Sequence, residues 1–360
     1  NNFRIINSTF IGNGRDTVGA HSIYVRHINN SEISGNVIHS GSGGGITLHG
    51  SSYNVLISRN DIFANNNGIG VNGGYSEIEE FDNVTIEKNK IHDHVYPQGY
   101  ALMLASLTNS RIINNLVYDN RLGAISLSTS WGSEDIQTRN VEVYNNLFYN
   151  STYLTDFKDY QMKNISIKNN IFYCDDPTQQ IWRACVSYNL NDSETQLDYN
   201  FYYQVNRADE KAIQYNGTFY NVSGLFAARG KEQHGIFIEP NFVDKQENNF
   251  RLNTNSSAID FGTSVPVFED FDGNSRPQGL GWDIGAYEYV NGSENPPANQ
   301  INSVINASRI SGVAPLAVFF DATETTHLNT SIRPFHELDY TWDFGNPSSG
   351  TWATNGKSKN

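Results

Sequence analysis

Polar segments recur at regular intervals along the N-terminal third of the chain, and they carry side chains suited to acid–base chemistry. In order they contain His39, Asn65-Asn66, His92-Asp93-His94 and Asp119-Asn120-Arg121. A neutral imidazole can accept a proton near pH 7, and an arginine can disperse the charge of an enolate. This set predicts a β-elimination beside a carboxylate, with Tyr100 as a proton donor. The alternative is that His92 and His94 only brace a loop.

Two further groups could bind a substrate or support another reaction. The segment TDFKDYQMK carries Lys158 and Asp159 next to Asp156. Its lysine could serve as a base for elimination, whereas the two carboxylates could serve a glycosidase. His49 is expected to point outward from a strand, and Trp131 lies in an insertion where its ring could stack on a sugar. The alternative for these residues is an ordinary solvated surface.

A repeat must position these side chains. Eight segments follow the order apolar, any, apolar, any, any, Asn, any, apolar, from Phe3-Ile5-Ser8-Phe10 to Thr195-Leu197-Asn200-Tyr202. Successive Asn positions (Ser8 in the first copy) are 28, 24, 29, 26, 31, 24 and 30 residues apart. This period on alternating hydrophobics predicts a parallel β-helix. The asparagines should stack at a bend between two strands. Each side-chain amide should form a hydrogen bond with the next rung, and the asparagine backbone should adopt the left-handed conformation that the bend needs. Val55, Phe148 and Ile167 should be buried.

A third strand per repeat gives the chain its family resemblance. It occurs at 46–48, 69–71, 102–104 and 125–127. Three strands per turn over residues 1–250 resemble the right-handed pectate-lyase-like proteins. The stretches NFVDKQENNFRLNTNSSAIDFG and DFDGNSRPQGLGWDIGAYEY resemble the closing segment of secreted bacterial β-helix proteins. The resemblance implies an all-β fold, with one right-handed parallel β-helix over residues 1–290.

The C-terminal part resembles a different family. Residues 291–300 are polar and contain two prolines, which is typical of a linker. Beyond them, Pro315, Phe319, Asp321 and Trp342-Asp343-Phe344-Gly345 resemble a PKD domain, an immunoglobulin-like β-sandwich. Residues 301–360 supply about 60 of the roughly 100 residues of such a sandwich. The chain also begins inside a rung without a cap, so we expect a fragment.

Composition limits the partners. The formal net charge is −14, and we find no basic stripe for nucleic acid and no apolar run that could span a membrane. Cys174 and Cys185 bracket an insertion and could form a disulfide, which would fit an oxidising compartment; two free thiols are the alternative. We expect a monomer that is secreted or attached to the cell surface.

An acidic run near the C-terminal end of the β-helix resembles a calcium loop at first sight. It contains Asp270, Asp272 and Asn274, but an EF-hand register would place Phe268 at the first ligand position. A structural turn with Arg276 pairing to Asp283 is the better interpretation. Ca²⁺ is therefore only a possible cofactor, and no other is indicated.

Two functional hypotheses follow. The first is a carbohydrate-active enzyme, a polysaccharide lyase rather than a glycoside hydrolase, with its site on the rungs spanning residues 39 to 160. The second is a non-catalytic surface rod that binds glycans. An enzyme should gather titratable groups in one groove, whereas a rod should scatter them.

Overall fold

The computed structural model describes residues 2–13, 20–72, 79–94, 99–129, 137–157, 159, 161–175, 186–205 and 213–290, together with six short strands between 301 and 354. The chain divides into two compact units, Asn1–Tyr289 and Val290–Asn360. In the second unit the strands form two-stranded antiparallel pairs: β29 (Ile301–Asn302) with β32 (Thr326–His327), β30 (Asn306–Ala307) with β31 (Phe320–Asp321), and β33 (Tyr340–Trp342) with β34 (Trp352–Thr354). The PKD domain stays a prediction, and the predicted linker lies outside the described residues.

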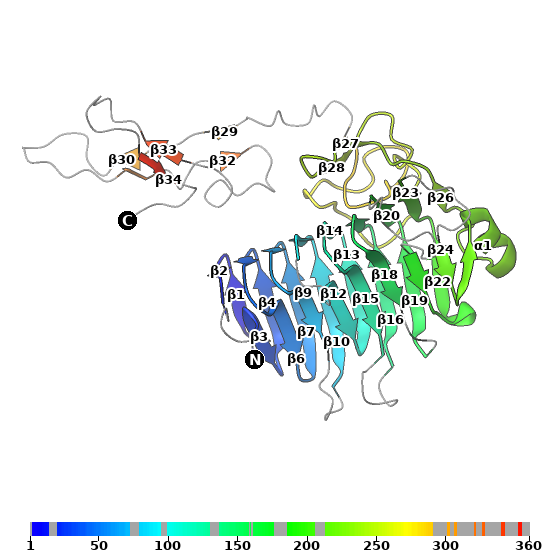
Figure 1. Cartoon of the computed structure of the whole chain (residues 1–360), viewed down its shortest axis with the longest axis horizontal. Helices are drawn as coiled ribbons and strands as arrows, with labels where there is room; N and C mark the ends of the chain where they lie inside the picture. Colours follow the sequence, from blue (N-terminus) through cyan, green and yellow to red (C-terminus); the bar gives the residue numbers. More distant parts are fainter. Residues whose placement is uncertain are drawn as a thin grey trace, which may run out of the picture. The chain divides into compact units, whose positions relative to one another are not determined.

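The first unit is a parallel β-helix in which each turn contributes one strand to each of three sheets (Figure 1). Sheet A contains β1 (Arg4–Ile6), β4 (Asn29–Ser34), β7 (Ser52–Ser58), β10 (Phe81–Glu87), β13 (Leu107–Ile113), β16 (Arg139–Tyr144), β19 (Lys163–Lys168) and β22 (Thr195–Asp198). Sheet B contains β2 (Thr9–Ile11), β5 (Val37–His39), β8 (Asp61–Phe63), β11 (Lys90–His92), β14 (Leu116–Tyr118), β17 (Leu147–Tyr149), β20 (Ile171–Cys174), β23 (Phe201–Gln204) and β26 (Ile236–Phe237). Sheet C contains β3 (Ile23–Arg26), β6 (Gly44–His49), β9 (Asn67–Val71), β12 (Tyr100–Ala105), β15 (Gly123–Ser128), β18 (Tyr153–Phe157), β21 (Val186–Tyr188), β24 (Ile213–Tyr215) and β25 (Thr218–Tyr220).

Inward side chains of the three sheets form one continuous hydrophobic column. Equivalent residues pair across neighbouring strands, as Ile57 does with Ile86, and both are fully buried. Alternation makes this possible because every second side chain of a strand points to the same face. Val55, Phe148 and Ile167 expose 2%, 0% and 0% of their surface, as predicted.

Buried asparagines stack at the corner between sheets A and B, as the sequence predicted. At Asn60, the backbone N–H and the side-chain Nδ2 donate to Asn89 Oδ1 over 3.0 and 2.9 Å, and Nδ2 also donates to the Ile33 carbonyl over 2.9 Å. The same contacts link each of Asn36, Asn60, Asn89, Asn115, Asn146 and Asn170 to the next, ending at Asn200. We call this row the asparagine ladder.

The left-handed residue at this corner is not the ladder asparagine but the residue before it. Gly35, Arg59 and Lys88 have φ angles of 67°, 53° and 52°, respectively. The backbone therefore turns one residue earlier than predicted, and the asparagine that follows is left with its side chain aligned along the helix axis.

The side chains of Lys231 and Glu232 pair with polar groups left at the C-terminal end of the β-helix. Asn200 donates from Nδ2 to Glu232 Oε1 over 2.8 Å, and Tyr202 donates its hydroxyl to the same oxygen over 2.7 Å. The Lys231 ammonium donates to the carbonyls of Asp192 and Thr195 over 2.7 and 2.5 Å. The preceding helix α1 (Val222–Arg229) starts at an Asn221 cap and ends at Gly230 in the left-handed region, with φ of 65°.

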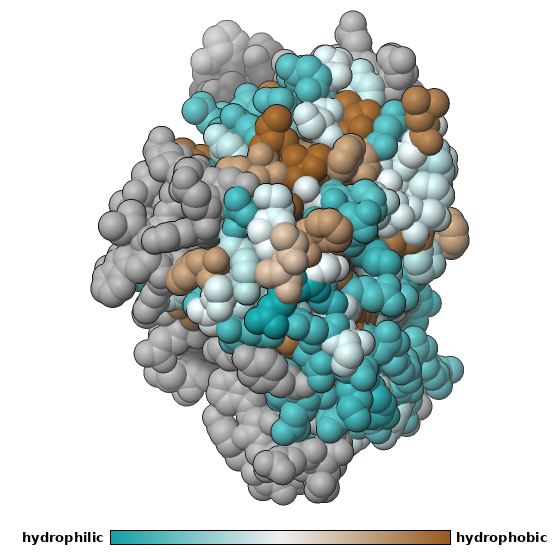
Figure 2. Space-filling view, turned by 90° about the vertical axis from the view of Figure 1, so that its right-hand side faces the viewer, coloured by the Kyte–Doolittle hydropathy of each residue, from teal (hydrophilic) through white to brown (hydrophobic). Residues whose placement is uncertain are grey.

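After β26, the last strand of sheet B, a closing segment folds back over the outer face of that sheet. It includes the hairpin of β27 (Phe242–Asp244) and β28 (Asn249–Leu252). Phe250 packs on Tyr118 and Tyr149, with ring centroids 5.2 and 4.9 Å apart. Seen from the end that carries α1, hydrophobic residues gather in the upper half of the view and hydrophilic ones cover the lower half (Figure 2).

The predicted ion pair in the closing segment is wrong in its partner. Arg276 Nη1 lies 2.6 Å from Glu288 Oε1, and both side chains are fully buried. Asp283 offers Arg276 only its backbone carbonyl, at 3.3 Å, because its carboxylate accepts the backbone N–H groups of Asp260 and Tyr289. Asp270 is likewise saturated by Asn274 and by the Glu288 backbone N–H.

Candidate functional site

Sheet C differs from the rest of the β-helix in its flanking loops. Each crossing from sheet A to sheet B takes two residues, from Asn7-Ser8 to Tyr199-Asn200. By contrast, the long connections between strands up to β24, at 12–22, 72–80, 93–99, 129–138, 175–185 and 205–212, each join a strand of sheet C to its neighbour in the chain. Insertions that cluster around one face of a solenoid commonly mark the binding face.

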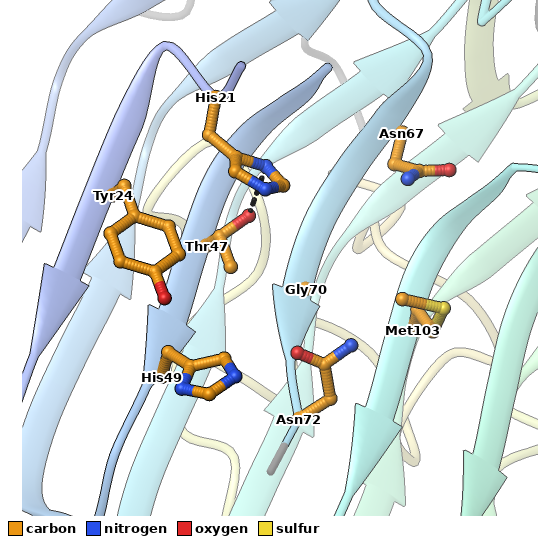
Figure 3. Close-up of a pocket in the computed structure, with 8 residues that line it drawn as sticks. All are labelled: His21, Tyr24, Thr47, His49, Asn67, Gly70, Asn72 and Met103. Atoms are coloured by element: carbon orange, nitrogen blue, oxygen red, sulfur yellow. Dashed lines mark hydrogen bonds between the residues drawn. The ribbon is translucent and has the colours of Figure 1, made fainter. Parts of the chain in front are cut away.

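A pocket of about 230 Å³ opens on the outer face of sheet C, over β3, β6, β9 and β12 (Figure 3). It is lined by His21, Tyr24, Thr47, His49, Asn67, Gly70, Asn72 and Met103. Its two imidazoles and its tyrosine lie together over β3 and β6, which belong to two successive rungs.

His49 is oriented by a buried carboxylate. Its Nδ1 lies 3.1 Å from Glu79 Oε1, and the Glu79 side chain is 1% exposed. Glu79 is itself held by the backbone N–H of Gly50, which donates to Oε2 over 2.9 Å. The contact has the distance of an ion pair, but among the described residues neither His49 Nδ1 nor Glu79 Oε1 makes a hydrogen bond; a proton on Nδ1 would face the carboxylate and leave Nε2 for a ligand.

His21 is arranged in the opposite sense. The backbone N–H of Gly44 donates to its Nδ1 over 3.1 Å, and the Thr47 hydroxyl lies 2.7 Å from the same atom. Nδ1 is therefore the acceptor, and Nε2 carries the proton in the neutral ring. Burial, with a smaller contribution from the nearby His49, lowers the pKa of His21 below its usual value. His21 thus offers an N–H donor close to the acceptor of His49.

Tyr24 and Arg26 complete this end of the face. The Tyr24 ring stacks between His21 and His49, with centroids 5.4 and 5.9 Å away, and it is 49% exposed. Arg26 is in register with His49 on the neighbouring strand, and its Nη2 lies 3.8 Å from Glu79 Oε1. A base, a cation and a hydroxyl donor therefore occupy adjacent positions.

Two polar atoms of the residues that line the pocket are buried without a hydrogen bond within the described part of the chain: His49 Nδ1 and Asn67 Oδ1. Leaving a buried acceptor unsatisfied costs on the order of 1–3 kcal/mol. A ligand hydroxyl donating to Asn67 Oδ1 would remove that cost.

Farther along the same face, Tyr100 donates its hydroxyl to Asp156. Tyr100 starts β12, Asp156 belongs to β18, and β15 lies between them. The Tyr100 side chain passes over Gly123, where an added Cβ would lie 2.3 Å from its ring. Burial, and then Asp156, raise the pKa of Tyr100 well above its usual range, so the phenol stays protonated.

The structure places the predicted His92 within sheet B rather than beside this pocket. Its Nε2 lies 3.0 Å from Asp61 Oδ1 and its Nδ1 lies 2.7 Å from Asp93 Oδ2. The ring also stacks between Phe63 and Tyr118, with centroids 5.1 and 4.7 Å away. Both nitrogens and both ring faces have protein partners, which favours the bracing interpretation.

His94 has a structural position as well. Asn65 N donates to its Nδ1 over 3.2 Å, and the His94 N–H donates to Asn120 Oδ1 over 3.3 Å. These contacts form a second buried row, at the corner between sheets B and C. Burial lowers the pKa of His94 to about 3, so the ring is neutral. Asp93, between the two histidines, is left-handed with φ of 54°, which breaks the alternation of sides that an extended strand would impose on them.

The remaining predicted residues are scattered. Asp119 lies next along that corner, accepts a bond from Asn150 over 2.6 Å and has a pKa raised mainly by burial. Arg121 is exposed, and its backbone N–H donates to the His94 carbonyl over 2.9 Å. His39 stacks on Phe63 with centroids 4.6 Å apart. The Thr129 hydroxyl donates to Asp159 at the edge of sheet C, whereas Trp131 and Lys158 lie outside the described residues. A catalytic role for the residues of sheet B and its corner stays a prediction.

Of the predicted residues described above, His49, Tyr100 and Asp156 lie on the outer face of sheet C. His21, Tyr24 and Glu79 were not predicted. The strand at 23–26 was overlooked although Ile23-Tyr24-Val25 repeats the apolar alternation of Ile46-Thr47-Leu48. Glu79 ends an insertion, so no periodic signal points to it.

The structure describes one cysteine of the predicted disulfide, and its described residues contain no group suited to a metal ion. Cys174 is disulfide-bonded, and the predicted partner Cys185 lies outside the described residues. Among the residues that the structure describes, no group of three or more His, Cys, Asp or Glu side chains could hold a metal ion. Ca²⁺ therefore stays a prediction. Within the same residues, no helix has the length and hydrophobicity needed to cross a membrane.

Comparison with known proteins supports the fold class. The family described as "Right handed beta helix region" matches residues 1–133, which form the first rungs of the three-sheet solenoid, and this match supports a right-handed β-helix. Among solved structures, one titled "Crystal structure of pectate lyase Pel9A" aligns at 14% identity over 78% of this chain and 72% of that one. Its TM-score of 0.34 is too low to assign an activity. No curated protein matches the chain.

Proposed function

We propose that the chain binds a polysaccharide along sheet C and cleaves it by β-elimination, with His49 as the base. The observation that carries this proposal is the pairing of His49 with the buried Glu79, 3.1 Å away, at the edge of a pocket. An imidazole base beside a buried carboxylate is a recurring catalytic arrangement. The amide, hydroxyl and tyrosine groups of the pocket suit the hydroxyls and faces of sugars.

In the proposed reaction, His49 Nε2 removes the proton beside the carboxylate of a uronic acid unit. The electron pair of that C–H bond forms a C=C bond as the bond to the neighbouring glycosidic oxygen breaks. Arg26, beside His49, would stabilise the negative charge that builds on the uronate. The departing oxygen takes a proton, for which the Nε2–H of His21 and the hydroxyl of Tyr24 are the available donors.

Hydrolysis fits the site less well. A glycosidase needs two carboxyl groups about 5–9.5 Å apart across the scissile bond. On the described part of the face, Glu79 is committed to His49 and Gly50, whereas Asp156 lies four strands away from β6, roughly 19 Å at about 4.8 Å per strand. The disulfide at Cys174 supports an extracellular or cell-surface location, because disulfides persist in oxidising compartments.

The test is to incubate the protein with a panel of uronic-acid polysaccharides and follow unsaturated products by ultraviolet absorbance. His49→Ala should lower the rate at least about 100-fold, and Glu79→Gln about tenfold or more. His92→Ala is the matched control, since His92 also pairs with carboxylates but lies on sheet B. It should leave the activity of the folded protein unchanged.

Two results would contradict the proposal. Full activity of His49→Ala together with loss of activity in His92→Ala would move the site to sheet B. Absence of products from every acidic and neutral glycan, with binding retained, would favour the non-catalytic rod.

A further inference from the structure

The outer face of sheet C changes in charge along the helix axis. At one end, over β3 and β6, lie the cation Arg26 and the imidazoles of His21 and His49. The described outward side chains of the next three strands are uncharged: Asn67, Gly70, Asn72, Tyr100, Met103, Ser126 and Ser128. Beyond them, on β18, comes the carboxylate of Asp156. Among the described side chains, a partly exposed arginine beside the buried Glu79 carboxylate therefore stands at one end of the face, and a carboxylate stands at the other.

At the end of the face that carries Asp156, Tyr100 and Asp156 are joined by a hydrogen bond. Asp156 accepts the Tyr100 hydroxyl across β15, and the approach is possible only because position 123 is a glycine. Asp156 is also in register with Ser126 on β15, which is in register with Met103 on β12. The carboxylate thus stands in line with the floor of the pocket.

The two ends differ in the sugars that they would accept. A carboxylate accepts hydrogen bonds from sugar hydroxyls but repels the carboxylate of a uronic acid. Arg26 at the opposite end would attract that uronate. A ligand that covers both ends gains most when its charge lies over β3 and β6 and its uncharged part lies over β12 to β18.

We propose that the face contains two subsites of opposite charge preference: an anionic sugar binds at Arg26 and His49, and an uncharged sugar binds at Tyr100 and Asp156. This inference rests on the proposed function and specifies its substrate class. The substrate is a heteropolysaccharide that contains both uronic acid and uncharged units, rather than a pure polyuronate.

The experiment measures binding by the full chain carrying His49→Ala, so that no probe is cleaved. The probes are a galacturonic acid hexamer, an uncharged mannose hexamer, and a hexamer alternating glucuronic acid with N-acetylglucosamine. In this background Asp156→Asn should strengthen binding of the galacturonic acid hexamer about three- to tenfold, because one repulsion is removed. Binding of the alternating hexamer should change less than about twofold.

Matched variants separate a local effect from net charge and from folding. Glu87→Gln removes the same charge on the outer face of sheet A and should leave the binding of all three probes unchanged. Tyr100→Phe keeps the ring over Gly123 but loses the donor to Asp156, and it should weaken binding of the alternating hexamer a few-fold.

The outcomes are distinguishable. Equal effects of Asp156→Asn and Glu87→Gln, or no effect of either, would overturn the two-subsite proposal while leaving cleavage at His49 intact. Failure of all three probes to bind to the folded protein would overturn the two-subsite proposal and the proposed function together.

Discussion

The asparagine ladder and the outer face of sheet C are built from the same rungs, yet they treat polar atoms in opposite ways. Along the ladder, Asn115 donates to Ile86 and Asn146 and accepts from Asn89, so both ends of the amide are satisfied. On sheet C, Asn67 Oδ1 is buried without a partner. Crossings beside the ladder are two residues long, whereas the edges of sheet C carry the insertions.

This difference separates positions that stabilise the fold from positions that can meet a ligand. A polar group whose bonds are all made inside the protein has little to offer a substrate, and its replacement costs stability. A polar group left unsatisfied in a pocket costs stability in the free protein and recovers it on binding. The predictions below test this separation with residues of the same type in the two regions.

The largest expected effect is loss of stability in the ladder. Asn115→Ala removes the bonds to Ile86, Asn146 and Asn89 from a fully buried corner. We expect the free energy of unfolding to fall by about 3–5 kcal/mol, measured by denaturant titration.

The matched variant is Asn72→Ala, which removes the same amide from the pocket of sheet C. Its stability should change by less than about 1 kcal/mol, and glycan binding should weaken. If both variants lose equal stability, the two regions do not differ as described.

The second prediction concerns the end of the ladder and pH. Burial raises the pKa of Glu232 from its usual value near 4.5 to about 8, with Asp198 adding to the rise. The folded protein therefore holds this proton between those values while the unfolded chain releases it. The contribution of Glu232 to stability should be full below about pH 4.5 and should be lost as the pH rises from there to about 8, by on the order of 1–3 kcal/mol. Thermal unfolding from pH 6 to pH 9 measures it.

Glu232→Gln is the control, because an amide does not titrate here. In this variant the fall of stability between pH 7 and 9 should nearly disappear. Asp283 would still contribute at lower pH, since burial and the adjacent Glu288 raise its pKa to about 7. An unchanged profile in Glu232→Gln would assign the effect to another group.

The smallest expected effect is at the second buried row. His94→Asn places an amide between Asn65 and Asn120, matching both neighbours. The free energy of unfolding should change by less than about 1 kcal/mol, and any glycan cleavage should remain at the wild-type rate. A loss of cleavage without a loss of stability would restore the catalytic prediction for His94.

The fold was predictable because burial imposes period and alternation on the sequence. The asparagines from Asn36 to Asn200 marked the corner between sheets A and B, and Val55 and Phe148 marked the column. The corner between sheets B and C was not recognised as a ladder, because its residues vary: Gly41, Asn65, His94 and Asn120 share a position but not a side chain.

The candidate site differs from the predicted one in its residues. The sequence predicted a base, an arginine and a tyrosine at His92, Arg121 and Tyr100, whereas the proposed function assigns these roles to His49, Arg26 and Tyr24. A search for periodic residues finds the histidines that recur at equivalent positions of the repeat, and such histidines stack against neighbouring rungs. Glu79 lies 30 residues after His49, in a connection outside the repeat. Its contact with His49 could therefore not be predicted from the spacing of the repeats.

The asparagine ladder has an electrostatic consequence. Every ladder amide donates toward its C-terminal neighbour, so seven side-chain dipoles from Asn36 to Asn200 align head to tail. Their positive end meets the Glu232 carboxyl group, whose Oε1 accepts the last hydrogen bond of the row. The polarity is common to all rungs, so a rung could be added or removed without changing what Glu232 receives. Reversing one amide would set donor against donor and break the row.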